Sequence, residues 1–161
     1  MDKVIPVTSG VGRGPTQLAA LDAALFDAGI ANYNLVHLTS IIPEGRQPVI
    51  RKLDRNHMEY GFKLYVVLAR ATATEVGKEA WAGLGWVVTE GAVKRGLFVE
   101  HAGSGQHEVT VAIHETLTAM VKYRGEEFGD IQQEVVGITC EGEPACAIVA
   151  AVYDSEGWSG T

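Results

Sequence analysis

The sequence lacks the features that mark several large classes of protein. Two cysteines, Cys140 and Cys146, are too few for a disulfide framework, and we expect both to be buried thiols. No apolar run approaches the 18 residues of a membrane-spanning helix, and the N-terminal residues form no apolar segment of the signal-peptide kind. These absences predict a cytoplasmic protein.

Excess positive charge is also missing. The chain has 13 Lys and Arg against 20 Asp and Glu, which gives a net charge of −7. Proteins that bind nucleic acid or anionic membranes usually carry the opposite imbalance, so we expect neither partner. The five histidines show no metal-ligand spacing, and we expect no metal.

The chain does have the composition of one compact domain. Hydrophobic residues make up 47% of its 161 residues, enough for a substantial core, and no linker, repeat or low-complexity tract divides it. We therefore expect a single domain over residues 1–161.

Hydrophobic periodicity and turn residues predict two helices and about seven strands. Thr16 is expected to cap a first helix ending near Ala28, with Leu18, Leu21, Leu25 and Ala28 on one stripe and Gly29 as its stop. The predicted elements are strands at 4–9, 32–42, 59–71, 79–89, 96–101, 134–139 and 145–153, a polar loop at 43–55, and a second helix at 104–123.

The strand composition predicts the fold class. Segments such as 65–68 and 148–152 are apolar on both faces and need cover on both sides. We therefore expect an α+β fold, a four-layer αββα sandwich of stacked sheets with outer helices. Two helices are few for two sheet faces, so oligomerisation is expected to supply further cover.

A glycine-rich segment, Gly10-Val11-Gly12-Arg13-Gly14-Pro15, lies between the first strand and the first helix. Its spacing departs from the G-x-G-x-x-G pattern of dinucleotide sites, and no acidic residue ends a second strand about 20 residues on. We expect a tight turn that allows a close approach, with nucleotide binding as the weaker alternative.

Thr39-Ser40 is the most informative step in the chain. It ends the apolar segment that begins at Asn32, and a proline follows at Pro43. A hydroxyl pair at a strand end commonly caps a turn, which is the structural alternative. The functional interpretation is that Ser40 Oγ attacks the preceding carbonyl and cleaves the chain.

The surrounding residues favour the functional interpretation, because the chain resembles the pyruvoyl-dependent arginine decarboxylase family. The resemblance spans most of the chain in scattered pieces. These are Pro15, Asp22-x-Ala24-Leu25-x-x-Ala28-Gly29-Ile30, Asn32-x-Asn34-Leu35, Thr39-Ser40-Ile41 with Pro43, Gly96-Leu97-Phe98-Val99-Glu100, and Cys146-Ala147-x-x-Ala150-Ala151. The chain has Thr39 where the family more usually has serine, a change that leaves the attacking hydroxyl in place.

The resemblance implies a self-made cofactor and a decarboxylation. Cleavage before Ser40 would leave a β chain of residues 1–39 and an α chain of residues 40–161 that begins with a pyruvoyl group. The group would form a Schiff base with L-arginine and yield agmatine, a polyamine precursor, and carbon dioxide. The family's sites lie between the subunits of a trimer, so the resemblance implies a homotrimer or a pair of trimers.

Four positions carry the predicted site. Ser40 is the pyruvoyl precursor, and Asn34, on the same face by period-two counting, is our candidate for polarising the Thr39 carbonyl. Glu100 ends an apolar run, which suits a desolvated acid, with a solvated strand-end acid as the structural alternative, and the family's catalytic glutamate stands in the matching motif. Asp22 matches a family aspartate that contacts the substrate guanidinium. Leu18, Leu21 and Leu25 surround it in the sequence, so its burial would need a cationic partner, and an exposed helix acid is the structural alternative.

Two other functions remain open from the sequence. One is the same processing and fold with another amino acid as substrate. The other is a homo-oligomeric binding protein that never cleaves.

Overall fold

The computed structural model describes residues 3–54 and 57–160 of the chain. Its elements are β1 (Lys3–Arg13), α1 (Gln17–Ala28), β2 (Asn34–His37), β3 (Ile41–Ile42), β4 (Arg46–Ile50), a 3-10 turn (His57–Glu59), β5 (Lys63–Ala73), β6 (Glu79–Val88), β7 (Gly96–Gly103), α2 (Gln106–Arg124), β8 (Gln132–Thr139) and β9 (Ala145–Glu156).

The strands form two sheets. The first sheet has the order β2-β5-β9-β1-β4, and the second has the order β3-β7-β6-β8. Strands β1 and β9 pair antiparallel through the centre of the first sheet, while β4 joins β1, and β2 joins β5, in parallel at its two edges. In the second sheet all three pairings are antiparallel.

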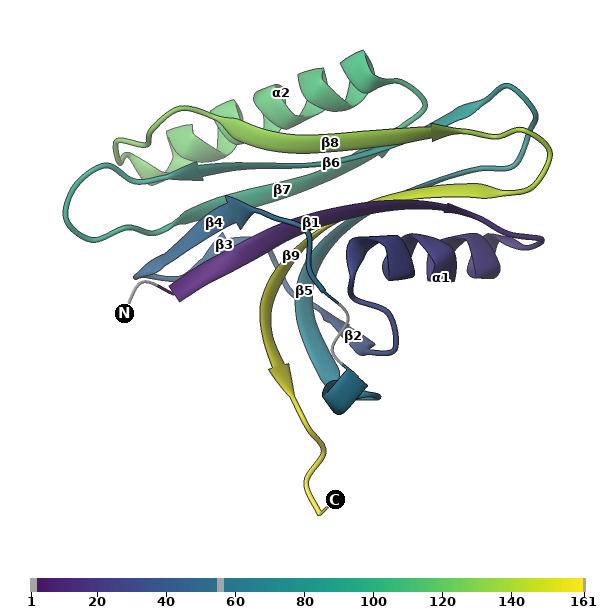
Figure 1. Cartoon of the computed structure of the whole chain (residues 1–161). Coiled ribbons are helices and arrows are strands. Elements are labelled where there is room, and N and C mark those ends of the chain that lie inside the picture. The colour runs from purple at the N-terminus through teal and green to yellow at the C-terminus, as the bar shows by residue number, and fades with distance from the viewer. Residues whose placement is uncertain (1–2, 55–56, 161) are drawn as a thin grey trace.

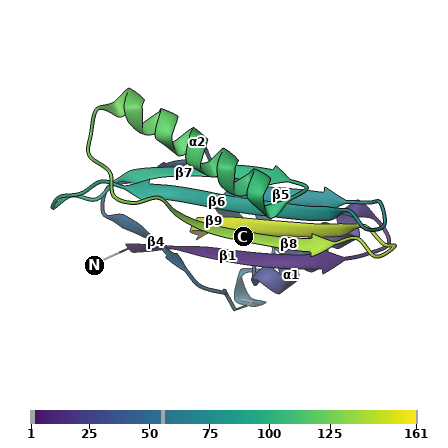
Figure 2. The ribbon, with the colours of Figure 1, turned by 90° about the horizontal axis from the view of Figure 1, so that it is seen from above.

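The two sheets stack face to face, with α1 on the outer face of the first and α2 on the outer face of the second (Figure 1). Viewed from above, α2 runs across β7 and β6 (Figure 2). Three apolar clusters fill the spaces between the layers: one under α1, one between the sheets and one under α2. The α+β prediction is confirmed, and the layering is that of an αββα sandwich.

The central cluster combines small residues from one sheet with large residues from the other. Alanines of β5 and β9 face Leu84, Trp86 and Phe98, and the rings of Trp86 and Phe98 pack edge to face with centroids 5.9 Å apart. This layer holds the ends of β7 and β9 in fixed positions, and both strands contribute to the site described below.

The predicted glycine turn is wrong for Gly10 and Gly12, which lie within β1. Both glycines lie against α1: a Cβ on Gly10 would stand 2.2 Å from the Ala24 carbonyl oxygen, and one on Gly12 would stand 2.5 Å from the Ala24 nitrogen. The expected close approach is therefore real, and its partner is the helix. A phosphate loop at the helix N-terminus does not form from this strand.

Helix α1 begins and ends as predicted. The Thr16 hydroxyl accepts a hydrogen bond from the Ala19 N–H, and Gly29 closes the helix with a φ of +80°. The predicted stripe is wrong for Leu18, which is 75% exposed, and right for Ala28, which is fully buried. Leu21 and Leu25 are partly buried against the core, and the fully buried face of the helix is Ala20, Ala24 and Ala28. Only small side chains fit where the helix lies this close to a strand.

The segment 32–42, predicted as one strand, is divided. Its first part, β2, pairs with β5 in one sheet, and its last part, β3, pairs with β7 in the other. The loop predicted at 43–55 contains β4, which pairs with β1, and its last residue, Arg55, lies outside the described residues. These differences raise the strand count from about seven to nine in the described chain.

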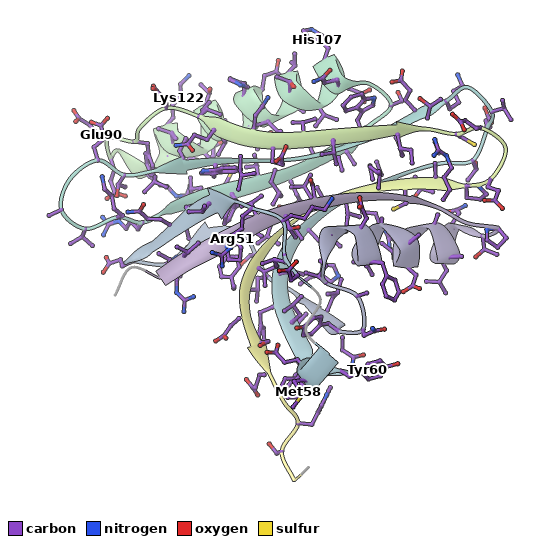
Figure 3. All side chains as sticks on the ribbon, in the orientation of Figure 1. Arg51, Met58, Tyr60, Glu90, His107 and Lys122 are labelled. Carbon is purple, nitrogen blue, oxygen red and sulfur yellow. The ribbon has the colours of Figure 1, made fainter. Side chains whose placement is uncertain are left out.

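Other predictions concern the surface and the thiols. Cys140 and Cys146 are free and buried as expected, and burial raises the pKa of the Cys146 thiol. His107 and Lys122 project from α2 away from the sheet (Figure 3). Among the described residues, no helix is long and apolar enough to cross a membrane.

Candidate active site

Ser40 lies where the chain crosses from one sheet to the other. The Leu38 N–H donates to the Val66 carbonyl of the first sheet at 2.8 Å, and two residues later the Phe98 N–H of the second sheet donates to the Ser40 carbonyl at 2.8 Å. The Thr39-Ser40 peptide bond therefore lies in a short crossing segment that is anchored at both ends.

Glu100 contacts this segment directly. Ser40 Oγ donates a hydrogen bond of 2.8 Å to Glu100 Oε2, although the two residues are 60 positions apart. The carboxylate is an acceptor for the serine proton, which is the contact that a general base needs. Of the four predicted site residues, these are the two that the single chain brings together.

The predicted desolvation of Glu100 is wrong for the single chain. Strand β7 continues to Gly103, and the Glu100 side chain is exposed. The reason lies in the pairing: β3 covers β7 only at Gly96 and Leu97, so the strand has an open edge from Val99 onward. An isolated chain leaves this edge, and the acid on it, in contact with solvent.

An open hollow of about 360 Å³ adjoins the acid. This volume is within the range of small-molecule sites. Its lining comes from the end of β2, from the stretch of β5 beyond its pairing with β2, and from the open edge of β7: His37, Leu68, Ala69, Arg70, Glu100, His101 and Ala102.

Tyr153 is a site residue that the sequence analysis missed. Its hydroxyl donates a hydrogen bond of 2.7 Å to the carbonyl of Ile41, the residue after Ser40. Burial raises the pKa of this phenol, and the negative charge of Glu100 adds to the effect, so the group stays protonated and can donate. The available signal was weak: period-two counting places Tyr153 on the face of β9 that carries Val149 and Ala151.

Asn34 does not meet Ser40 in the single chain. Its side-chain amide donates to the Gly61 carbonyl at 2.9 Å, and its backbone N–H donates to the Phe62 carbonyl at 2.8 Å. The prediction of a shared strand face is wrong, because β2 ends at His37 and the period-two count does not continue to Ser40.

Asp22 is exposed on the outer surface of α1, as the structural alternative has it, and the single chain does not bury it. Its neighbour one turn earlier, Leu18, lines a smaller hollow of about 200 Å³ together with Gln17, Leu21, Arg70 and Thr72. Arg70 lines both this hollow and the one beside Glu100, so the two hollows are neighbours.

The residues 3–54 and 57–160 contain no group of three or more histidine, cysteine or acidic side chains placed to hold a metal ion.

Comparison with known sequences identifies the family. The sequence profile of the pyruvoyl-dependent arginine decarboxylases matches residues 4–156. The chain is 35% identical over 153 residues to the pyruvoyl-dependent arginine decarboxylase of Halobacterium salinarum, with 92% of each chain covered. It is 29% identical over 154 residues to pyruvoyl-dependent arginine decarboxylase 2 of Archaeoglobus fulgidus, with 94% of this chain and 96% of the relative covered.

A third relative, the pyruvoyl-dependent arginine decarboxylase of Thermoplasma volcanium, is 39% identical over 101 residues, and that match covers 63% of this chain and 56% of the relative. The chain belongs to the pyruvoyl-dependent arginine decarboxylase family. It is an enzyme of the carboxy-lyase class that depends on a covalently bound pyruvoyl group.

The residues present fit such a group at position 40. A pyruvoyl group derives from a serine, and here the serine hydroxyl contacts an acid, its carbonyl is held by the Phe98 N–H, and the next carbonyl is held by Tyr153. The strand that would carry the group is thus anchored independently of residues 1–39.

Proposed function

We propose that this chain cleaves itself between Thr39 and Ser40, and that the pyruvoyl group formed at residue 40 converts L-arginine to agmatine and carbon dioxide. The observation that carries the proposal is the 2.8 Å hydrogen bond from Ser40 Oγ to Glu100 Oε2. The names of the relatives in Halobacterium salinarum and Archaeoglobus fulgidus support arginine as the substrate.

Processing begins with the serine. Glu100 takes the proton from Ser40 Oγ, and the oxygen attacks the carbonyl carbon of Thr39. The peptide C–N bond then breaks, the Ser40 nitrogen takes up a proton, and Thr39 is left joined to Ser40 through an ester. Loss of the Ser40 α-proton expels Thr39 as a carboxylate, and hydrolysis of the remaining dehydroalanine by water releases ammonia.

The group supplies a ketone that condenses with the substrate amine and accepts the electron pair left when the carboxylate departs. The other residues of the site hold the backbone around residue 40 in place and transfer protons. The Phe98 N–H and the Tyr153 hydroxyl fix the carbonyls of residues 40 and 41. Glu100, adjacent to residue 40, is the group we assign to proton transfer.

Substrate recognition and assembly belong to the same proposal. We assign the guanidinium of arginine to Asp22, an exposed carboxylate that can form a bidentate pair. In one chain Asp22 and Ser40 are not in contact, whereas a trimer would bring the Asp22 of one subunit to the Ser40 of another. The open edges of β5 and β7 beside the hollow are surfaces on which a second subunit can dock.

The test is a denaturing intact-mass measurement on the purified chain, with Ser40→Ala as the inactive variant and Ser155→Ala as a matched control. We expect fragments 1–39 and 40–161 from the unaltered chain and from the control, with the larger fragment lighter than a serine-started one by the loss of ammonia. The Ser40→Ala chain should stay intact. An unaltered chain that stays whole after long incubation would contradict the proposal.

A panel of amino acids then tests the substrate. Amine formation from L-arginine, and little from lysine, ornithine or histidine, is expected. If the chain cleaves itself but prefers another amino acid, the processing part of the proposal stands and arginine is rejected as the substrate.

A further inference from the structure

The backbone around Ser40 forms a turn of three residues. The Ile41 N–H donates a hydrogen bond of 2.8 Å to the Thr39 carbonyl oxygen, with Ser40 between them. Ser40 is not among the described non-glycine residues with positive φ, so the turn is of the inverse γ type, which is common at strand ends. The acceptor in this bond is the carbonyl that Ser40 must attack.

The sheet topology explains why the Ile41 N–H is available. In an antiparallel pair, hydrogen-bonded positions alternate with positions whose backbone groups point outward. The Phe98 N–H bonds to the Ser40 carbonyl, so the next pair, Ile41 and Leu97, is an outward-pointing one.

Because β3 is an edge strand, no further strand of the sheet receives these outward groups of Ile41. The Ile41 carbonyl accepts from Tyr153, and the Ile41 N–H donates to Thr39. The edge position therefore turns one strand amide back onto the peptide bond that precedes Ser40.

We infer that the Ile41 N–H is the oxyanion donor of self-cleavage, an inference that rests on the proposed function. When Ser40 Oγ adds to the Thr39 carbonyl carbon, the electron pair of the C=O bond moves onto the oxygen, and the Ile41 N–H stabilises that negative charge. The charge returns to reform the C=O bond as the C–N bond breaks. Oxyanion holes place a donor 2.7–3.1 Å from the position that the oxyanion will occupy. The Ile41 N–H is already 2.8 Å from the ground-state carbonyl oxygen.

The same donor serves the second step. When a base takes the Ser40 α-proton, the C–H electron pair forms the Cα=Cβ double bond, the Cβ–Oγ bond breaks, and the Thr39 carboxylate leaves with the pair of that bond. Its carbonyl oxygen is the atom that the Ile41 N–H already contacts, so one hydrogen bond stabilises both the oxyanion and the leaving group. The sequence had assigned this role to Asn34, whose side-chain amide instead donates to Gly61.

The experiment removes this one hydrogen. Residue 41 is replaced by the α-hydroxy acid analogue of isoleucine, which converts the Ile41 N–H to an ester oxygen and keeps the side chain. We expect the rate at which fragment 1–39 appears to fall on the order of 100-fold. Mass separates this fragment from fragment 1–40, which hydrolysis of the introduced ester would produce.

The matched control is the same replacement at residue 38. The Leu38 N–H also makes a 2.8 Å hydrogen bond to a backbone carbonyl, that of Val66, but it does not touch the cleaved bond. The variant with the ester at residue 38 should cleave at nearly the rate of the unaltered chain. Equal rates for the residue 38 and residue 41 esters would overturn the inference, whereas failure of the unaltered chain to cleave would remove the proposed function itself.

A second measurement needs no change at residue 41. In the unprocessed Ser40→Ala chain, the Ile41 amide proton should exchange with solvent much more slowly than a free edge-strand amide. Exchange at the unprotected rate would show that the N–H is not engaged with Thr39 and would also overturn the inference, even if the ester chain did not fold.

Discussion

The hydroxyl of Tyr153, near the end of the last long strand, holds the carbonyl of Ile41, which is 112 positions earlier and follows the proposed cleavage site. The bond links the first sheet to the edge strand of the second. It also lies beside Glu100, whose charge helps to raise the pKa of the phenol. Tyr153 therefore positions the residue that would lie next to the new chain end in the proposed processing.

Removing this hydroxyl should slow processing without preventing folding. We expect Tyr153→Phe to lower the free energy of unfolding by about 1 kcal/mol, the usual contribution of one hydrogen bond, and to slow the appearance of fragment 1–39. Tyr65→Phe is the matched control, because the Tyr65 hydroxyl bonds to Glu156 and not to the backbone around Ser40. Unfolding curves and a mass-spectrometric time course measure the two effects, and identical time courses for both variants would contradict the positioning role.

Glu100→Gln keeps the shape of the acid and removes its basicity. If Glu100 takes the proton of Ser40, cleavage should slow by a factor on the order of 100. Glu44→Gln is the control, because Glu44 pairs with Arg95 and is an acid of the same size on the loop after β3. Cleavage of the Glu100 variant at the unaltered rate would assign the proton transfer to another group.

The sequence predicted local features well and non-local ones poorly. The limits of α1 follow from Thr16 and Gly29, whose capping interactions are made within the helix itself, so they can be read locally. The division between β2 and β3 could not be predicted from the sequence, because 32–42 has one continuous apolar pattern. Only the hydrogen bonds of Leu38 to Val66 and of Ser40 to Phe98 show that the segment joins two different sheets.

The site shows the same contrast. The family resemblance singled out Ser40 and Glu100 before their contact was known. Neither Tyr153 nor the Ile41 N–H could be found in this way, because a phenol 112 positions away and a backbone amide acquire their roles only from the packing. The hydrophobic pattern did not identify Ala20 and Ala24 as buried, because the close approach of α1 to β1 selects the alanine face of the helix.

Asp22→Asn should separate substrate recognition from folding and processing. Loss of a charge-assisted hydrogen bond predicts a KM for arginine roughly 10- to 100-fold higher, with cleavage and thermal stability nearly unchanged. Asp27→Asn is the control on the same helix, because Asp27 accepts a 2.9 Å hydrogen bond from the Val11 N–H and pairs with Lys52. It should lower stability and leave KM alone, and the reverse pattern would reject the role of Asp22.

Gly10→Ala tests the contact between α1 and β1. The added Cβ would lie 2.2 Å from the Ala24 carbonyl oxygen, so the helix must move, and we expect a loss of about 3 kcal/mol in the free energy of unfolding. Gly129→Ala is the control, because its Cβ would be 3.5 Å from the nearest atom, an ordinary contact. Equal unfolding midpoints for the two variants would contradict the packing described here.

The raised pKa of Tyr33 predicts that the free energy of unfolding falls at alkaline pH. Burial, together with the hydrogen bond and the charge of Glu59, raises the pKa of its phenol from 10.0 to about 12. The folded chain keeps this proton at a pH where the unfolded chain loses it. The contribution of the Tyr33 phenol to the free energy of unfolding is therefore complete below pH 10 and is lost as the pH rises to about 12.

Chemical unfolding at several pH values measures the effect. The Tyr33→Phe chain should lose less stability over this range than the unaltered chain, while Tyr60→Phe, at an exposed site nearby, should follow the unaltered profile. Parallel profiles for all three chains would contradict the raised pKa.

The crossing of Leu38–Ser40 between the sheets determines what kind of molecule the proposed cleavage would produce. Residues 3–39 supply β1, α1 and β2, and β1 lies between β9 and β4 inside the first sheet. A cleaved molecule is therefore a complex of two interleaved polypeptides, and its unfolding also separates them. Its unfolding midpoint should depend on protein concentration, which an uncleaved single chain does not require, and once separated the two pieces must find each other again to rebuild the sheet.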